Sequence, residues 1–212
     1  MLAKRVGTQR VQLLDVDASL WEGAAEKVGL IPAPAAMQPS KYIQGKWKDG
    51  DFGATSEVGC RARHNGTEVA FRLDWACSSP RMTRLDNDDF ADGAALLFPL
   101  SKNASLIMGS DNRPVNMWHW RADRPQAARS NVAVGIGTSR VVDPVSVVVN
   151  AQHRNGRWSV VFVRSMAGGP DAAPFVAGSD VNVAFAVWQG HARERGGLKA
   201  FSPQWLSVRL EA

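Results

Sequence analysis

Cysteine is scarce in this chain, with Cys60 and Cys77 the two among 212 residues. Two thiols cannot build the disulfide framework that holds many small secreted domains together. They also cannot supply the four thiolates of a structural zinc site or an iron–sulfur cluster. A C-x-x-C-H sequence is absent as well, which excludes the usual covalent attachment of a c-type haem.

Long hydrophobic runs are missing too. No apolar run approaches the roughly 18 residues that a membrane-spanning helix needs, so we expect no membrane span. Residues 1–7 are not followed by an apolar region of signal-peptide length. On its own this predicts a cytoplasmic protein, or a protein that is exported together with a partner.

The charge balance is mildly basic but shows no basic block. The formal net charge is +5 and the isoelectric point about 9.6. The Lys and Arg residues are scattered, and no basic helix can be drawn through them. A nucleic-acid interface would gather these charges on one face. We therefore expect a solvated surface and no nucleic-acid partner.

The sequence motifs of several enzyme classes are also absent. It contains no G-x-S-x-G, no H-E-x-x-H and no phosphate-binding G-x-x-x-x-G-K-[ST]. No two of its four histidines lie three or four residues apart, so none forms a local metal pair. The strongest single ligand candidate is His119, which on a strand faces away from Trp118 and Trp120. His64 and His153 lie beside Asn-Gly pairs, where we expect exposure.

Aspartates gather at Asp86, Asp88, Asp89 and Asp92. A calcium-binding loop needs a spaced D-x-[DN]-x-[DN]-G pattern, and Phe90 occupies one of its ligand positions. We interpret the cluster as a solvated turn with capping roles rather than a cation site.

Two Asn-Gly pairs predict β-hairpins. Asn-Gly suits a two-residue type I′ turn, in which both residues need a positive φ. The first pair is expected to join residues 58–64 to 67–75, and the second to join 145–154 to 157–164. In the first hairpin Cys60 would then lie opposite Phe71, which leaves Cys60 and Cys77 out of register for a disulfide.

Short strands with turn residues between them dominate the rest of the chain. This spacing favours an all-β protein, and we predict one domain over residues 1–212, an antiparallel β-sandwich with a few short helices. Tryptophans on expected strands include Trp118, Trp120, Trp158, Trp188 and Trp205, and they either fill a core or line a flat aromatic ligand. Further strands are expected at 11–16, 94–99, 104–108, 115–120, 182–188 and 204–210.

Seven segments stand out in order along the chain: 92–99 (DGAALLFP), 108–109 (MG), 114–120 (PVNMWHW), 155–158 (NGRW), 163–166 (VRSM), 184–188 (AFAVW) and 195–199 (RGGLK). Together they resemble the haem-binding domain shared by ethylbenzene dehydrogenase, dimethyl sulfide dehydrogenase and related reductases. The resemblance runs from about residue 58 to the C-terminus. It is closest to the ethylbenzene dehydrogenase branch, which includes enzymes that hydroxylate sterol side chains.

The resemblance implies a non-catalytic gamma subunit of a heterotrimer. Its alpha subunit would hold a molybdenum cofactor, and its beta subunit would hold iron–sulfur clusters. This chain would hold haem b and pass electrons from the beta subunit to an external acceptor such as a cytochrome. Several such enzymes are periplasmic, with the export signal on the alpha subunit. Export with a partner is therefore implied, and a cytoplasmic location is the alternative.

The resemblance also implies two axial ligands for the haem iron, Met108 of the Met-Gly motif and Lys199 after the paired glycines. A thioether is soft and favours ferrous iron, while an amine ligates only in its neutral form, which burial favours. Two protein ligands leave no open position on the iron, which suits electron transfer. Met117 is the alternative thioether, on the same face of its strand as His119.

Two other functions stay open from the residues alone. One is a carbohydrate-binding or similar β-sandwich module, whose tryptophans would stack on a ligand. It predicts a protein without a chromophore. The other is a free-standing hydrolase, against which stands the absence of a visible nucleophile and base.

Overall fold

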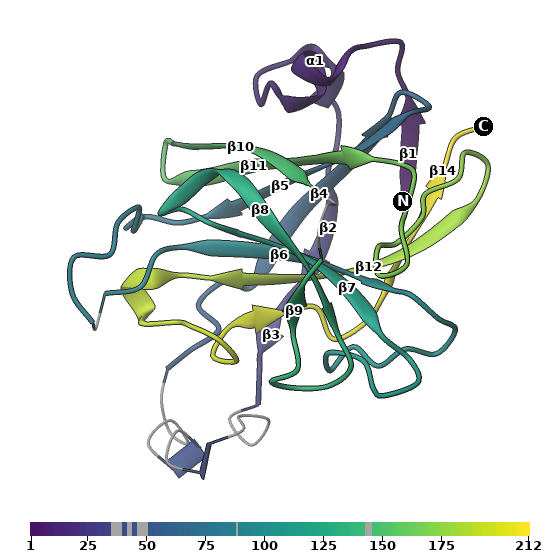
Figure 1. Cartoon of the computed structure of the whole chain (residues 1–212). Helices are drawn as coiled ribbons and strands as arrows, with labels where there is room; N and C mark the ends of the chain where they lie inside the picture. The colour runs from purple at the N-terminus through teal and green to yellow at the C-terminus, as the bar shows by residue number, and fades with distance from the viewer. Residues whose placement is uncertain (35–39, 42–43, 46–50, 88, 143–145) are drawn as a thin grey trace.

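The computed structural model describes residues 1–34, 40–41, 44–45, 51–87, 89–142 and 146–212. Nearly all regular structure in these residues is β, and the predicted all-β class is confirmed (Figure 1). The strands are β1 (Leu2–Arg5), β2 (Glu26–Gly29), β3 (Ile31–Pro32), β4 (Glu57–His64), β5 (Glu68–Ala76), β6 (Gly93–Pro99), β7 (Val115–Arg121), β8 (Arg124–Ala133), β9 (Arg140–Val141), β10 (Val147–Arg154), β11 (Arg157–Ser165), β12 (Asp180–Trp188), β13 (Ala200–Phe201) and β14 (Leu206–Leu210).

The described helices are short. They are the α-helix α1 (Arg10–Leu14) and the 3₁₀ turns η1 (Ser19–Trp21) and η3 (Gly190–Ala192). None of the described helices has the length and apolar character that crossing a membrane requires.

Ten strands pair in a closed ring. Their order is β14-β1-β4-β5-β11-β10-β8-β7-β6-β12, and β12 pairs again with β14. Neighbours in this ring are antiparallel except at β1, which lies parallel to both β14 and β4. Outside the ring, β13 and β3 extend from β12, β2 pairs with β4, and β9 pairs with β8.

The predicted antiparallel sandwich therefore needs correction to a barrel-like closed sheet. The closure comes from β1, which joins β14 on one side to β4 on the other, as Figure 1 shows at the right of the molecule. A four-residue strand carries too little pattern to be found in the sequence. The polar residues of β8, which connects β7 to β10, concealed that strand as well.

The ring is best described as two walls around a core. One, the β5 wall, consists of β4, β5, β11 and β10; the other, the β7 wall, consists of β8, β7, β6 and β12. Aromatic rings fill the space between them, and Trp118 and Trp120 of β7 lie there with no exposed surface. Phe71 of the β5 wall contacts Phe98 and Trp118 of the β7 wall at ring-centroid distances of 5.6 Å and 5.9 Å. For these tryptophans the core-filling interpretation is confirmed.

The two Asn-Gly hairpins turned out differently. At the second, Asn155 and Gly156 have φ of 52° and 71°, and Arg154 pairs with Arg157, as a two-residue type I′ turn requires. Residue 145, where its first strand was expected to begin, lies outside the described residues. At the first hairpin Asn65 does not have a positive φ. The Asn65 side-chain oxygen instead accepts hydrogen bonds from the backbone N–H groups two and three residues on, which lengthens the turn.

The longer turn moves the register of the first hairpin by two residues. His64 pairs with Val69, and Cys60 pairs with Leu73 rather than Phe71. A shift of two keeps every side chain on its predicted face. Both cysteines are buried and free, in agreement with the predicted absence of a disulfide. His64 is buried rather than exposed.

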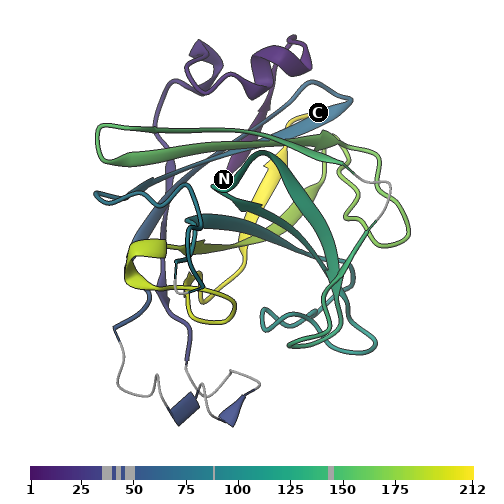
Figure 2. The same ribbon diagram turned by 60° about the vertical axis from the view of Figure 1, so that its left-hand side comes forward.

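The N-terminal segment covers the outer face of the β5 wall. Residues 11–16, expected to form a strand, instead contain most of helix α1, whose N-cap residue Gln9 forms a capping box with Gln12. Leu13 and Trp21 pack on Val161 and Val163 of β11. In Figure 2 this segment lies across the top of the wall, so an outer sheet face that would otherwise be solvated becomes a second, smaller core.

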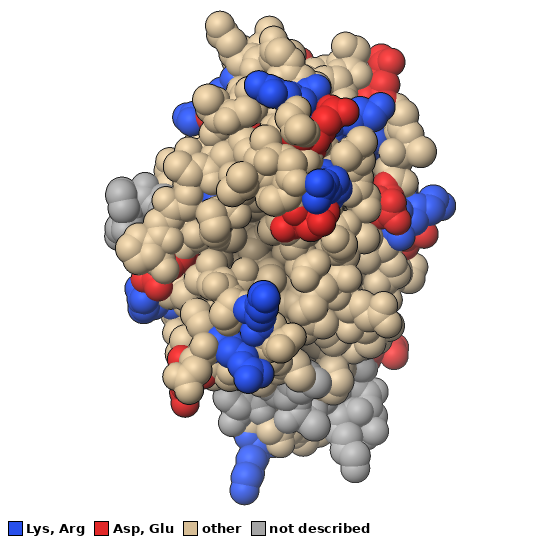
Figure 3. Space-filling model, turned by 90° about the vertical axis from the view of Figure 1, so that its right-hand side faces the viewer, with Lys and Arg blue, Asp and Glu red and all other residues tan. Residues whose placement is uncertain are grey.

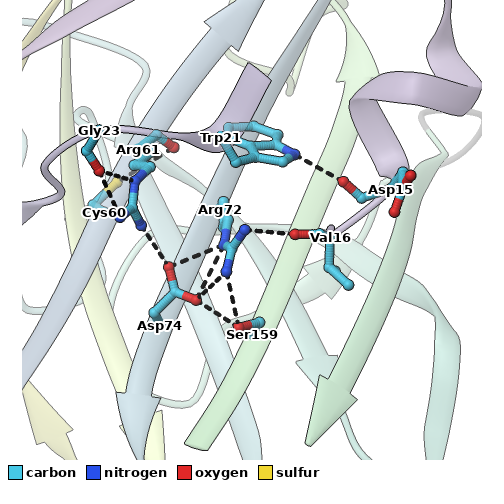
Figure 4. A network of polar contacts seen from close by, with 9 residues as sticks. All are labelled: Asp15, Val16, Trp21, Gly23, Cys60, Arg61, Arg72, Asp74 and Ser159. Atoms are coloured by element: carbon cyan, nitrogen blue, oxygen red, sulfur yellow. Dashed lines mark hydrogen bonds and ion pairs between the residues drawn. The ribbon is translucent and has the colours of Figure 1, made fainter. Parts of the chain in front are cut away.

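Paired charges hold that segment in place (Figure 4). The Asp74 carboxylate accepts bonds from Arg61 Nη1 at 2.9 Å, Arg72 Nη2 at 2.8 Å and Ser159 Oγ at 2.5 Å. Arg72 also donates to the carbonyl oxygen of Val16 at 2.5 Å. Two arginines and one carboxylate thus fasten the strands to the segment that covers them.

The surface seen in Figure 3 carries positive and negative side chains interspersed over a largely uncharged face. Apart from the buried Asp74 pairs and the Arg121–Asp123 pair, the ion pairs found among the described residues include at least one substantially exposed partner, and such pairs contribute little to stability. This face is in keeping with the solvated surface predicted from the sequence.

Candidate functional site

A cavity of about 780 Å³ lies on the outer face of the β7 wall. Its floor follows from strand alternation, since residues next to the core-facing ones point the other way. Small side chains of β6 and β12 form much of it, including Ala95, Ala184 and Ala186. Large residues at these positions would fill the space. The volume falls within the roughly 300–1,000 Å³ of cofactor and small-molecule sites.

Loops form the sides of this cavity. They come from the segment before β7, from the segment after β8, from the segment that joins β12 to β13 and from the segment before β6. The exposed Ile107 and Ile136 lie on the first two of these loops. Both predicted ligand residues, Met108 and Lys199, line the cavity although they are far apart in the sequence. Folding therefore brings the predicted pair together.

Met108 is held by a strained loop rather than by the predicted strand at 104–108. Its φ is 60°, which is rare for a residue with a side chain. Gly109 has φ of 73°, and a Cβ there would lie 2.7 Å from the carbonyl oxygen of Arg113 and 2.9 Å from that of Ala133. The Met108 carbonyl accepts a bond from Gly135 N–H at 2.7 Å. Backbone strain of this kind clusters at functional sites, where surrounding contacts maintain it.

Lys199 enters the cavity from the loop that joins β12 to β13. Its Nζ lies 5.2 Å from the ring centroid of Trp188, on the cavity side of β12. A tight turn with Gly196 at φ of 56° precedes it, closed by two backbone bonds between Arg195 and Leu198. Burial lowers the pKa of the Lys199 ammonium to about 8. Among the described residues no carboxylate forms an ion pair with it.

Two buried carboxylates anchor the loop that carries Lys199. Glu194 accepts bonds from the N–H groups of Gly53, Ala54 and Gln189 at 2.6, 2.7 and 2.8 Å, and burial raises its pKa. Asp92 accepts from the Gly190 N–H at 2.7 Å and from the indole N–H of Trp158 at 2.8 Å. Both bind backbone that is distant in sequence, so no local pattern could have revealed these roles.

His119 and Met117 also line the cavity, on the face of β7 that alternation predicted. The His119 ring centroid lies 5.0 Å from that of Trp188. Burial, and the positive charges of Arg121 and Lys199, lower the pKa of His119 to about 4, so its imidazole is neutral at pH 7. Met117 remains the alternative thioether, because it and Met108 border the same space.

Other candidate residues lie elsewhere. His153 belongs to β10 of the β5 wall, and its Nε2 lies 2.8 Å from the Cys77 carbonyl oxygen. The aspartate cluster forms no cation site among the described residues, and Asp88 lies outside them. Trp188 forms part of the cavity wall, and for this residue contact with a flat ligand stays a prediction.

Comparison with known proteins gives a consistent result. The model of the ethylbenzene dehydrogenase family matches residues 18–141 and 135–200. The chain is 34% identical over 205 residues to the dimethylsulfide dehydrogenase subunit gamma of Rhodovulum sulfidophilum, covering 92% of this chain and 75% of that protein. It is 32% identical over 161 residues to the chlorate reductase subunit gamma of Ideonella dechloratans, covering 74% and 66%.

A further relative is a Haloferax mediterranei protein provisionally named respiratory nitrate reductase heme subunit ORF7. It is 35% identical over 137 residues, which are 63% of this chain and 49% of that protein. The chain thus spans between half and three quarters of the length of these relatives. Among solved structures, a family 9 carbohydrate-binding module from Caldicellulosiruptor kristjanssonii in complex with glucose aligns with a TM-score of 0.56 over 100% of this chain and 95% of that one. At 7% identity this is a likeness of fold alone.

Proposed function

Because this chain belongs to the ethylbenzene dehydrogenase family, we propose that it is a haem-b-binding, electron-transfer subunit of a molybdenum enzyme complex. The observation that carries the proposal is that the fold brings Met108 and Lys199 to one cavity with an apolar, alanine-rich floor. Relatives named as gamma or haem subunits support the same function. The carbohydrate-binding alternative is less supported, since its structural likeness concerns the fold alone.

The donor set fits a haem. The lining is largely apolar, as a porphyrin face requires, and a thioether and an amine are among the groups that border the cavity. Such nitrogen and sulfur donors suit iron. The low pKa of Lys199 reduces the free energy needed to convert its ammonium to the neutral amine that can bind a metal. We propose Met108 and Lys199 as the two axial ligands, with Met117 the alternative thioether.

A bound haem would supply one-electron chemistry. The chain's own residues hold the two donors and set the charge around the site. Met108 is held by its strained loop, and Lys199 by the turn that Glu194 and Asp92 anchor. Two protein donors to the iron would leave no open position for substrate or O₂, which suits a subunit that relays electrons rather than one that catalyses.

The proposed partners follow from the family. Electrons would reach this chain from an iron–sulfur beta subunit served by a molybdenum alpha subunit, and leave to an external acceptor such as a cytochrome. We propose a periplasmic location reached by export with a partner, with the cytoplasm as the alternative. We also propose that residues 1–212 form one domain. Subunit names such as gamma in the relatives support the multi-subunit assembly.

The test is a visible spectrum of the purified haem-loaded chain, oxidised and then reduced. Sharp reduced α and β bands of a six-coordinate b-type haem are expected. Met108→Ala and Lys199→Ala should each change these bands, because each removes one axial donor. Met117→Leu tests the alternative thioether, and Met82→Leu, at an exposed methionine outside the cavity, is the matched control. Unchanged spectra in both ligand variants would contradict the assignment.

A further inference from the structure

Arg164 is an arginine within the barrel core. It belongs to β11, faces the space between the two walls and is 2% exposed. Its guanidinium carbon lies 5.0 Å from the ring centroid of Trp118 and 4.9 Å from that of Phe175. Arginine is almost never fully buried unless an acidic partner neutralises it.

That charge has no such partner among the described residues. The guanidinium donates to the carbonyl oxygens of Ser165, at 2.9 Å, and Ala173, and Nη1 has no hydrogen-bond partner. Burial lowers the pKa of Arg164 to about 10, so the group stays charged at neutral pH. By contrast, Arg61 and Arg72 on the opposite side of the β5 wall share the carboxylate of Asp74.

Stability does not account for an unneutralised buried arginine. Removing a charge from water costs free energy, which aromatic faces and two carbonyl oxygens offset only in part. Replacing buried charges by apolar residues of similar volume is often neutral or stabilising. The position therefore suggests a role in the electrostatics of the molecule.

The charge lies behind the cavity floor. Trp118, which the guanidinium contacts, is flanked along β7 by Met117 and His119, and these two line the cavity. Arg164 is thus on one side of the β7 wall, and the cavity is on the other. The material between them is strand backbone and packed aromatic rings, which screen a charge far less than water does.

We propose that Arg164 raises the reduction potential of the iron centre held in the cavity, by favouring the state that carries one more electron. The inference rests on the proposed haem function. Gain of one electron lowers the charge of the site by one unit, and a fixed positive charge across the wall stabilises that state. Arg164 touches neither donor and is a tuning residue, not a ligand.

The test compares substitutions that keep and remove the charge. Arg164→Lys retains it, while Arg164→Met and Arg164→Gln remove it with similar length. Each haem-loaded, full-length protein is titrated against redox mediators. A unit charge about one sheet spacing of ~10 Å away, at an effective dielectric constant of about 20, predicts that the Met and Gln variants lower the ferrous-to-ferric ratio at a fixed potential roughly fifteenfold. The Lys variant should stay near wild type.

Four controls isolate the effect. The absorption bands must match wild type, which shows that ligation is intact, and thermal unfolding verifies that each variant is folded. Lys4→Gln removes an exposed charge and should leave the potential unchanged. Because Arg164 is buried, the shift should persist at high ionic strength, where a surface charge effect is screened.

The outcomes separate the two proposals. A protein that binds no haem overturns the proposed function itself. Haem bound with wild-type bands, and a potential that equals the wild-type value in the Met, Gln and Lys variants, overturns the role of Arg164 alone. A potential that drops equally in all three variants also contradicts the role, because Arg164→Lys keeps the charge and the loss must then be structural.

Discussion

The outer faces of the two walls differ in what covers them. On the β5 wall the chain's own N-terminal segment covers the sheet, Leu13 and Trp21 are buried against it, and Asp74 neutralises the arginines beneath. On the β7 wall alanines leave a cavity of about 780 Å³, and Lys199 has no carboxylate partner among the described residues. The first face is complete as folded. The second has the composition of a surface that a further group completes.

The difference explains how a barrel-like fold can present a cofactor site outside its core. A sheet wall that faces the core on one side has an outer face that something else can cover. The size of the side chains on that face decides whether a protein segment or a bound ligand covers it. Bulky valines of β11 on the β5 wall receive a protein segment, whereas alanines of β6 and β12 on the β7 wall do not fill the space. Substitutions on the two faces should therefore affect different properties, stability on one and cofactor binding on the other.

The largest effect on stability is expected from Trp21→Ala. This tryptophan is 2% exposed and contacts the outer face of the β5 wall, so its removal leaves a cavity under the N-terminal segment. The free energy of unfolding should fall by about 3–5 kcal/mol. Urea unfolding measures it. The reduced haem spectrum of the folded fraction should be unchanged, and a shifted spectrum would break the separation of the two faces.

A somewhat smaller loss is expected from Asp74→Ala. The change leaves Arg61 and Arg72 without their shared carboxylate, at a site that is largely buried. We expect a loss of about 2–3 kcal/mol in urea unfolding, mostly from unneutralised charge. Glu57→Ala is the control, because the pair it forms with Lys27 is exposed and should contribute below about 1 kcal/mol. Equal losses in the two variants would contradict this account.

Gly109→Ala tests the strained loop at the edge of the cavity. Its added Cβ meets two carbonyl oxygens, and φ of 73° is unfavourable for alanine. The expected loss of unfolding free energy is about 1–3 kcal/mol, together with an altered haem spectrum because Met108 is displaced. Gly137→Ala, with a similar φ of 80° but nothing near its Cβ, separates strain from steric displacement. It should lose stability with a smaller change of spectrum.

The smallest effect on stability, with a large effect on binding, is expected from Ala186→Leu. The added carbons project into the cavity rather than into packed atoms, so unfolding free energy should change by less than about 1 kcal/mol. Haem content measured by absorption should fall sharply, because the leucine side chain occupies part of the cavity. Ala127→Leu, an exposed position on β8, should retain haem. Normal haem content in Ala186→Leu would show that the group binds elsewhere.

Particular residues show which local structures could be predicted from the sequence. The second hairpin was predicted correctly because Asn155 and Gly156 both take the positive φ that their residue types favour. The prediction from the same dipeptide at Asn65 was wrong, because the Asn65 side chain accepts a hydrogen bond from the backbone three residues on, which lengthens the turn. The strand expected at 104–108 is a loop, because the strained backbone of Met108 depends on contacts with Gly135 and the strands beneath it.

The sequence by itself determined the all-β class, the alternation that sets Trp118 and Trp120 against His119, and the family, since these depend on local periodicity and on motifs in order. Tertiary structure alone decided the closure through β1, the anchoring of the Lys199 loop by Glu194, and the buried charge of Arg164 behind the cavity. Each of these joins residues from separate parts of the chain. Local sequence carries no record of which distant backbone will satisfy a buried carboxylate or which sheet will lie against a buried guanidinium.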